Sequence, residues 1–386
     1  MTKENKYKFL SLFKSSILSI ASYDGIMMQM KGRWCSLRKF DLYEEYNSII
    51  SNANIINLIT KIHEYKGKQS YLLNSKNDTL DTLLKVAKIQ STSSSNKIEG
   101  IYTTDKRIKE IVNEKVEPKN RNEEEIAGYR DVLSLIHENY NFIDINKNTI
   151  LQLHRDLYKY TGYSYGGKFK NSQNYIEEIN EIGEKKIRFT PLATFETPIA
   201  IEDLCKSYNE LVIKESCDLL ILIPIFILDF VSIHPFNDGN GRMSRLLTLL
   251  LLYKANYMVG KYISIEKIIE ETKDSYYDSL KKSSTNWHNN KNDYSYFVEY
   301  YLGIILNAYK ELDYRIDIVK DKRKTSYDRV ICIFKDNFFP IDKAFIINKC
   351  PDLSETTIER TLNRLLKENK IVKISNGRYT KYKWNS

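Results

Sequence analysis

An apolar segment that leads directly into a polar turn constrains the fold of this chain more than any other feature. Residues 219–228 are all apolar, but the run is too short to span a bilayer, so we expect a buried helix that continues to residue 233. Residues 234–245 then read His-Pro-Phe-Asn-Asp-Gly-Asn-Gly-Arg-Met-Ser-Arg, and a second helix is expected over residues 240–252. The sequence therefore predicts two core helices joined by a turn that carries charged side chains.

This turn combines the residue types that are needed for chemistry at a phosphate group. A Gly-Asn-Gly turn that opens a helix leaves backbone N–H groups free to bind an anion. Arg242 and Arg245 supply guanidinium groups, which suit phosphate oxygens, and Asp238 can hold Mg²⁺ against the same phosphates. The ordinary pKa of His234 suits proton abstraction near neutral pH. These residues predict a site at which a hydroxyl group attacks a nucleotide phosphate.

The same segment resembles the signature of the Fic (Fic/Doc) family, His-x-Phe-x-(Asp/Glu)-Gly-Asn-Gly-Arg-x-x-Arg, at every constrained position. The alternative is a structural loop that carries a solvated histidine and arginine. The resemblance implies an enzyme that transfers AMP from ATP to a Ser, Thr or Tyr hydroxyl of a target protein and releases pyrophosphate. Self-modification is also compatible with it. We therefore expect Mg²⁺ as the cofactor and ATP as the co-substrate.

The resemblance also assigns a role to each matched residue. His234 would be the catalytic base that takes the hydroxyl proton, and Asp238 would be the metal ligand. A Fic relative that phosphorylates its target has lysine in place of Gly241, so the glycine at this position favours AMP transfer. The remaining positions would bind the nucleotide phosphates, and with Gly241 this set is Gly239, Asn240, Gly241, Arg242 and Arg245.

A second match lies far upstream. Residues 95–100, Ser-Asn-Lys-Ile-Glu-Gly, fit the inhibitory motif (Ser/Thr)-x-x-x-Glu-(Gly/Asn) of autoinhibited Fic proteins, with Ser95, Glu99 and Gly100 at the constrained positions. By this resemblance Glu99 pairs with Arg245 where the γ-phosphate of ATP would bind. The alternative is a surface loop, because the serines of residues 91–95 are poor helix formers. In some family members the same glutamate activates a water that removes AMP, so a brake, a hydrolytic base or both remain open.

The expected fold class is mainly α: a Fic helical core with a small β-hairpin flap, followed by a C-terminal winged helix-turn-helix. Only 14 glycines and 7 prolines occur among 386 residues, which favours long helices. We expect an N-terminal helical region with the inhibitory motif (residues 1–115), a Fic catalytic domain (116–318) and a winged helix-turn-helix domain (322–386). Apolar spacing predicts helices of the catalytic domain over residues 123–137, 149–160, 199–212, 265–283 and 294–312.

The flap is expected where two β-prone stretches, Asn174-Tyr175-Ile176 and residues 187–190, flank a polar turn that contains Gly183. In Fic proteins a hairpin at this place covers the active site, and target segments dock by adding a strand to it. An exposed strand edge binds an extended peptide through backbone groups with little regard for its sequence. Asn174, Tyr175 and Ile176 are thus candidate docking residues. The alternative is an ordinary surface hairpin.

The C-terminal region is distinguished by its charge. Of the formal net charge of +9, residues 320–386 carry +8, which indicates an anionic partner for this part of the chain. Helical patterns over residues 327–336 and 341–349, a helix that begins after Ser354 and a hairpin around Asn376-Gly377 resemble a winged helix-turn-helix. The candidate DNA contacts are Thr356, Thr357, Arg360, Arg364 and Arg378. A protein-interaction or dimerisation module remains the alternative, so a homo-oligomer is also compatible.

The remaining residues narrow the class of protein. The five cysteines are scattered and form no Cys-x-x-Cys pair, which argues against a disulfide framework or zinc site and for a reducing compartment. No signal peptide or membrane span is visible, so we expect a cytoplasmic protein with no membrane partner. His63, His137, His154 and His288 share no metal-like spacing and are expected to be packed or at the surface.

Three hypotheses follow from the sequence. The leading one is an autoinhibited protein adenylyltransferase that depends on Mg²⁺ and ATP. The alternatives are a protein de-AMPylase that uses Glu99, and a DNA-binding regulator whose Fic core only senses nucleotide. A sensor would not need the base, so His234 favours the enzymes.

Overall fold

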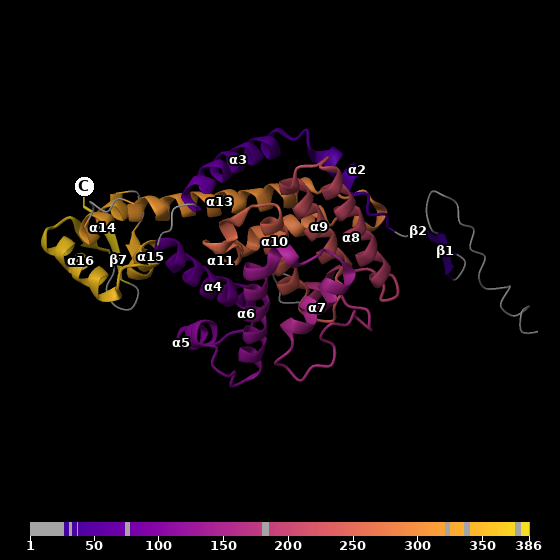
Figure 1. The fold of residues 1–386 in the computed structure, drawn as a ribbon, viewed down its shortest axis with the longest axis horizontal. Helices are drawn as coiled ribbons and strands as arrows, with labels where there is room; N and C mark the ends of the chain where they lie inside the picture. The colour runs from indigo at the N-terminus through magenta and orange to yellow at the C-terminus, as the bar shows by residue number, and fades with distance from the viewer. Residues whose placement is uncertain are drawn as a thin grey trace, which may run out of the picture.

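A computed structural model describes the backbone of residues 27–30, 33–36, 38–73, 78–179, 185–320, 325–335, 340–374 and 380–385. These residues form a mainly helical molecule, as the sequence predicts, with the C-terminal domain at one end of the helical core (Figure 1). In the described part of the chain, no helix is both long and apolar enough to cross a bilayer.

The centre of the core is the pair of helices that flanks the polar turn. α9 (Leu219–Ile233) begins and ends as predicted, and α10 (Asn240–Lys254) extends two residues beyond the prediction. Almost every side chain of both helices is buried, because neighbouring helices cover them on all sides. α8 (Thr197–Lys214) and α13 (Ser295–Lys320) pack against α9, and α6 (Arg121–Asn139) packs against α10. Because both helices are buried, the end of α9 and the start of α10 are fixed in position, and so is the turn between them.

The other helices surround this pair. α3 lies along α13, and α4 packs against α6 and α11 (Figure 1). The serines of residues 91–95 lie within α4 and not in a surface loop; four of the five residues of this stretch are buried. The bounds of these helices are α2 (Leu42–Ile49), α3 (Ala53–Leu73), α4 (Asp78–Ile98), α5 (Asp105–Lys109), α7 (Lys147–Leu157), α11 (Ile265–Glu271) and α12 (Lys273–Ser283).

Several predictions for the helical regions differ from the structure. The helix expected over residues 265–283 is two helices, α11 and α12, that break at Thr272, whose hydroxyl donates to the carbonyl of Ile268 at 2.7 Å. α13 continues to Lys320, well past the predicted end at residue 312. The N-terminal region, expected to be helical, also contains an antiparallel pair, β1 (Met27–Met30) and β2 (Arg33–Ser36).

The predicted hairpin is present, but its strands begin and end elsewhere. β3 (Ile176–Ile179) pairs with β4 (Lys185–Phe189), so Asn174 and Tyr175 precede the strand and only Ile176 belongs to it. The register shifts between Ile176 and Glu177, which pair with Phe189 and Ile187. Gly183 lies outside the described residues.

The C-terminal domain has the order of elements of a winged helix-turn-helix, with a three-stranded sheet of order β5-β7-β6. The helix expected over residues 341–349 is shorter, because Ile341 and Asp342 form a strand and Asp342 caps the helix by accepting the N–H of Phe345 at 2.8 Å. The Asn376-Gly377 turn and Arg378 lie outside the described residues. The elements are α14 (Ser326–Lys335), β5 (Ile341–Asp342), α15 (Lys343–Lys349), α16 (Glu355–Lys367), β6 (Ile371–Lys373) and β7 (Lys381–Trp384).

A buried carboxylate on α9 ties the chain before α2 to the core. Asp229 is fully buried and accepts hydrogen bonds from Trp287 Nε1 at 2.6 Å, the Tyr294 hydroxyl at 2.7 Å and Arg38 Nη2 at 3.2 Å. Glu45 on α2 lies 3.7 Å from the same Arg38 nitrogen. Burial, together with the nearby charge of Asp229, raises the pKa of Glu45 to about 7. Arg38 thus lies closer to Asp229 than to Glu45, and burial raises the pKa of both carboxyl groups.

This raised pKa predicts a pH-dependent change in stability for Glu45→Gln. The folded protein binds the Glu45 proton more tightly than the unfolded chain does, so the wild type loses stability as pH rises from about 4.5 to about 7. Glutamine mimics the protonated form. We expect the variant to match the wild type near pH 5 and to be more stable by about 1–3 kcal/mol at pH 8, measured by denaturant unfolding. Glu44→Gln, at an exposed position in the same helical turn, is the control, and equal gains at both pH values would contradict the assignment.

Candidate active site

His234 ends α9 in a backbone conformation that side chains rarely adopt. Its φ is +51°, which is left-handed and costs on the order of 1–3 kcal/mol unless the surroundings enforce it. Two side chains enforce it here. Lys170 Nζ donates to the carbonyl of Ile233 at 3.1 Å, and Asn174 Nδ2 donates to the carbonyl of Phe236 at 3.0 Å. These two hydrogen bonds hold the backbone on either side of His234.

The protonation state of His234 suits a general base. Nδ1 lies 3.2 Å from the carbonyl oxygen of Val231, which can only accept, so the proton is on Nδ1 and Nε2 has a free lone pair. Burial of the ring, together with the positive charge of Lys170, lowers the pKa of His234 to about 4. The ring is therefore neutral and ready to take a proton at neutral pH.

The turn after His234 is braced from both sides. The side-chain amide of Asn240 accepts the N–H of Phe236 at 2.9 Å and donates to its carbonyl at 2.8 Å. His154 stacks on the buried Phe236 ring at a centroid distance of 3.7 Å, accepts the N–H of Gly167 at 3.0 Å through Nδ1, and donates through Nε2 to the carbonyl of Asp238 at 3.0 Å. Asn240 and His154 thus hold the turn in one conformation.

An anion cradle opens at the start of α10. The N–H of Met243 donates to the carbonyl of Gly239 at 2.9 Å, which is the first backbone hydrogen bond of α10 in the described chain. The N–H groups of the helix before Met243 have no carbonyl four residues earlier to bond to, so they point outward. Gly239 has φ +83°, and a Cβ there would also approach the Tyr158 hydroxyl. A Cβ on Gly241 would overlap the Glu99 carboxylate, so Glu99 lies directly over the cradle.

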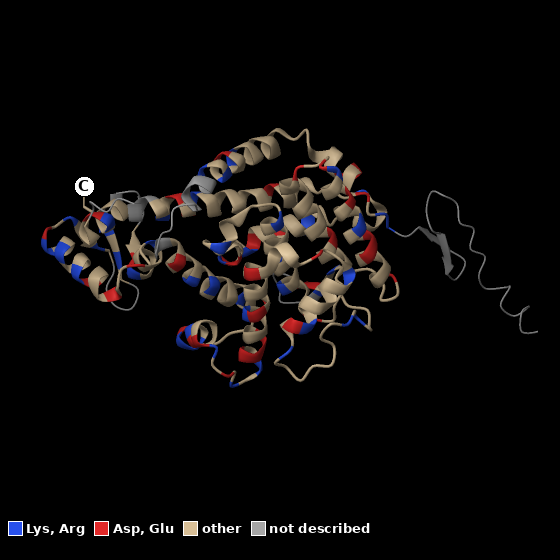
Figure 2. Ribbon diagram, in the orientation of Figure 1, with Lys and Arg blue, Asp and Glu red and all other residues tan. Residues whose placement is uncertain are grey.

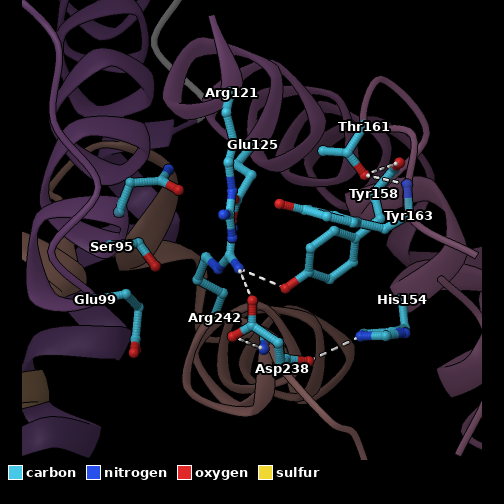
Figure 3. A network of polar contacts seen from close by, with 12 residues as sticks. Ser95, Glu99, Arg121, Glu125, His154, Tyr158, Thr161, Tyr163, Asp238 and Arg242 are labelled. Atoms are coloured by element: carbon cyan, nitrogen blue, oxygen red, sulfur yellow. Dashed lines mark hydrogen bonds and ion pairs between the residues drawn. The ribbon is translucent and has the colours of Figure 1, made fainter. Parts of the chain in front are cut away.

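Arg242 and Asp238 form a network with residues of α6 and α7 (Figure 3). Arg242 is fully buried: Nη1 lies 2.8 Å from Glu125 Oε2, and Nη2 donates to the Tyr158 hydroxyl at 2.6 Å. Asp238 Oδ2 is 3.6 Å from Arg242 Nη2, but its side chain is half exposed. The charge of Arg242 is therefore largely neutralised by the protein, whereas the Asp238 carboxylate faces solvent.

Arg245 is bound by the end of α4. Its Nε donates to Ser95 Oγ at 2.8 Å, and Nη2 donates to the Ser95 carbonyl at 2.9 Å and to Glu99 Oε1 at 2.7 Å. Arg245 is 3% exposed, whereas a third of the Glu99 side chain is open. Gly100, with φ +79°, allows the chain to turn away at this point. The pair that the resemblance implies is formed.

The structure brings most of the expected residues together but changes the role of two. Asp238, the glycines, both arginines, Ser95 and Glu99 lie at the start of α10 or against it. Asn174, expected to dock targets, instead holds the turn, and Arg242 is engaged by Glu125. His154 was expected to be a packed or surface residue, and no sequence signal distinguishes it from the other histidines.

Comparison with known proteins agrees with this geometry. Residues 144–252 match the Fic/DOC family. This stretch, which includes the polar turn, is the part of the chain that resembles the Fic/DOC family. Over 185 residues it is 25% identical to the Protein adenylyltransferase Fic of Nematostella vectensis, a match that covers 45% of this chain and 39% of that protein. The chain thus spans about two fifths of the length of this curated relative.

Solved structures share the Fic fold. A Fic family protein from Desulfovibrio desulfuricans superimposes with a TM-score of 0.55 at 18% identity, covering 87% of this chain and 97% of that one. A Fic domain containing signaling protein from Bacteroides thetaiotaomicron gives 0.54 at 21% identity, over 67% and 96%. Fic-1 from C. elegans gives 0.52 at 18% identity, over 70% and 74%. These low identities establish the fold alone.

The environment of His234 predicts how its ring titrates. We expect the neutral tautomer with the proton on Nδ1 and a titration midpoint near pH 4, measured by NMR of isotopically labelled histidine rings. His234→Gln assigns the signal, because it removes that one resonance from the spectrum. A midpoint near the ordinary value of 6.5 would show that the ring is open to solvent and that Val231 does not hold it.

Proposed function

We propose that this protein is a protein adenylyltransferase that transfers AMP from Mg²⁺-ATP to a hydroxyl side chain of a target protein, and that Glu99 inhibits it. The observation that supports this most directly is the position of the Glu99 carboxylate, which lies over Gly241 in the anion cradle and pairs with Arg245 at 2.7 Å. An anion of the protein thus lies where a nucleotide phosphate would bind. The matches to the Fic/DOC family and to an adenylyltransferase support the type of reaction.

The chemistry requires one base and a site for an anion. The target hydroxyl loses its proton to His234 Nε2 while its oxygen bonds to the α-phosphorus, the bond from that phosphorus to the β-phosphate oxygen breaks, and pyrophosphate leaves. General base catalysis of this kind contributes roughly 10²–10⁴-fold in rate. The outward N–H groups at the start of α10 stabilise the negative charge of the phosphates without reorganising.

The surroundings of Asp238 fit a magnesium ion that is shared with the nucleotide. Mg²⁺ is usually held by one or two carboxylates, water and substrate phosphates, and seldom by an all-protein cage. Accordingly, the described residues contain no cluster of three or more metal-ligating side chains, while the Asp238 carboxylate is half exposed beside the cradle. When bound there, Mg²⁺ would neutralise charge on the phosphates.

Inhibition by Glu99 follows from charge. The γ-phosphate of ATP and the Glu99 carboxylate are both negative, and both need Arg245, which already has three hydrogen bonds to α4. With Glu99 in place, ATP meets a like charge over the cradle. When the carboxylate is removed, Ser95 still holds Arg245, and the guanidinium can donate hydrogen bonds to a phosphate.

We therefore predict that Glu99→Gly increases AMP transfer and self-modification by about 10–100-fold, as expected for the loss of a charged hydrogen bond that competes with substrate. Wild type, Glu99→Gly, Glu99→Gln and His234→Ala are incubated with Mg²⁺ and ATP labelled at the α- or the γ-phosphate. Label from the α-phosphate only, strongest in Glu99→Gly and absent in His234→Ala, is the expected result. Glu99→Gln separates the charge from the bulk of the side chain.

Other outcomes of this experiment favour the other hypotheses. Label from the γ-phosphate would mean phosphorylation. Equal labelling of wild type and Glu99→Gly would reject inhibition by Glu99. If no variant is labelled, the protein removes AMP, uses a nucleotide donor other than ATP, or acts as a regulator without transferring AMP. Release of AMP from a modified protein by the wild type but not by Glu99→Gly would identify the de-AMPylase.

DNA binding by the winged helix is a second candidate function, and α16 carries the observation that favours it. Thr356 and Arg360 are exposed on this helix, while Ile358, Leu362 and Leu365 pack inward. Basic residues are interspersed with acidic ones over the domain (Figure 2). The exposed face of α16 is thus the surface that could enter a groove.

This face predicts the effect of Arg360→Ala on DNA binding. If Arg360 contacts a phosphate, the variant lowers affinity for duplex DNA and reduces the slope of log affinity against log salt by about 1. Arg155→Ala, at an exposed position of the Fic core, is the control. Binding of DNA that is unaffected by both substitutions, or no binding by the wild type, would favour a protein-interaction module.

A further inference from the structure

An irregularity in the flap places one arginine in an unusual position. Ile176 pairs with Phe189 and Glu177 pairs with Ile187, so Arg188 is the extra residue of a β-bulge in β4. Bulges next to active sites commonly redirect a side chain out of the regular alternation of a strand. Arg188 is the residue that this bulge redirects.

The Arg188 guanidinium forms no ion pair with a described residue. Its Nη1 atom is buried and has no hydrogen-bond partner among the described residues. The nearest candidate, Glu178 on β3, is engaged elsewhere: its Oε2 accepts from Lys281 Nζ on α12 at 2.8 Å. A buried cation without a partner is costly, and it persists where it serves a ligand.

The groups around Arg188 belong to the active site. Burial lowers the pKa of Arg188, and the titratable groups that act on it are Glu178 and two tyrosines of α12, Tyr276 and Tyr277. The pKa of Tyr277 is raised to about 12, mainly by burial and then by Glu99, so this ring lies within the fields of both Glu99 and Arg188. Arg188 also contributes to the low pKa of His234, after burial and Lys170. The backbone contacts also bring the bulge close to the base, because Ile176, which pairs with Phe189, is two residues from Asn174, and Asn174 Nδ2 donates to the His234 carbonyl at 3.4 Å.

We propose that Arg188 binds the α-phosphate of the nucleotide. His234 must act beside the α-phosphorus, since the attacking hydroxyl loses its proton there, and Arg188 is the unpaired cation near His234. Arg245, by contrast, is already paired with Glu99 over the cradle. A guanidinium offers paired N–H groups that match phosphate oxygens. This proposal rests on the adenylyltransferase function.

A contact between Arg188 and the α-phosphate would affect the binding of AMP and ATP but not the binding of adenosine. Adenosine has no phosphate and AMP has only the α-phosphate, so the difference between their affinities isolates the contact. Arg188 takes no part in bond making or breaking. Its charge stabilises the α-phosphoryl oxygens, so a variant loses affinity for the nucleotide and also turnover.

The test measures binding of adenosine, AMP and ATP by calorimetry in the full-length Glu99→Gly protein, in which the cradle is open. We expect Arg188→Met to weaken AMP and ATP binding by about 10–100-fold and to leave adenosine binding unchanged. Arg188→Lys keeps the charge and should recover part of the loss. Lys186→Met removes a positive charge from an exposed position of the same strand and should have no effect.

Each other result overturns the proposal. Equal weakening of adenosine and AMP would mean that Arg188 only positions the flap, and unchanged AMP binding would mean that Arg188 does not meet the phosphate. If Arg188→Met fails to fold, the ratio of AMP to adenosine affinity in Arg188→Lys decides instead, and an unchanged ratio contradicts the contact. If Glu99→Gly itself binds no nucleotide, the proposed function fails and this inference fails with it.

Discussion

The buried guanidinium of Arg245 is the interaction on which the rest of the site depends. At 3% exposure its charge cannot be solvated by water, so the protein must supply an anion, and Glu99 does so at 2.7 Å. Ser95 adds two further hydrogen bonds from the same end of α4. Breaking a buried pair is costly unless another anion replaces the lost one. The proposed inhibition and the proposed nucleotide binding would therefore both supply Arg245 with an anion, and a factor that moved α4 away would leave Arg245 in need of a phosphate.

The positive field of the site differs from the one that the sequence suggests. The motif presents two arginines as if both were free for phosphates, yet Glu125 neutralises Arg242 and Glu99 neutralises Arg245. Two cations that act on His234 form no ion pair with a described residue: Lys170, which donates to the Ile233 carbonyl, and Arg188. Their charges help to keep the pKa of His234 low, so the same field that attracts an anion keeps the base unprotonated.

The sequence predicts the helices and the motif well because both depend on local patterns. The apolar run 219–228 defined α9, and fixed spacing identified the turn that follows. What it misses depends on partners distant in the chain. Asn174 is β-prone by its neighbours, but its amide is drawn to the carbonyl of Phe236, so the strand starts later. His154 braces the turn through a ring stack and two hydrogen bonds that no spacing reveals.

Charge counting likewise does not show which basic side chains of the C-terminal domain are engaged by the domain itself. Arg329 pairs with Asp352, Lys343 with Glu359 and Arg364 with Glu368, each at 2.7–2.8 Å. Arg364, expected to contact DNA, also stacks on Tyr327 at 4.2 Å, so it is held against the domain. Thr357 is bonded to Ser354. Arg360 is exposed and forms no ion pair with a described residue. These pairs leave the net charge of the region unchanged, but they hold basic side chains against the domain, so any recognition of DNA would rest on few residues of α16.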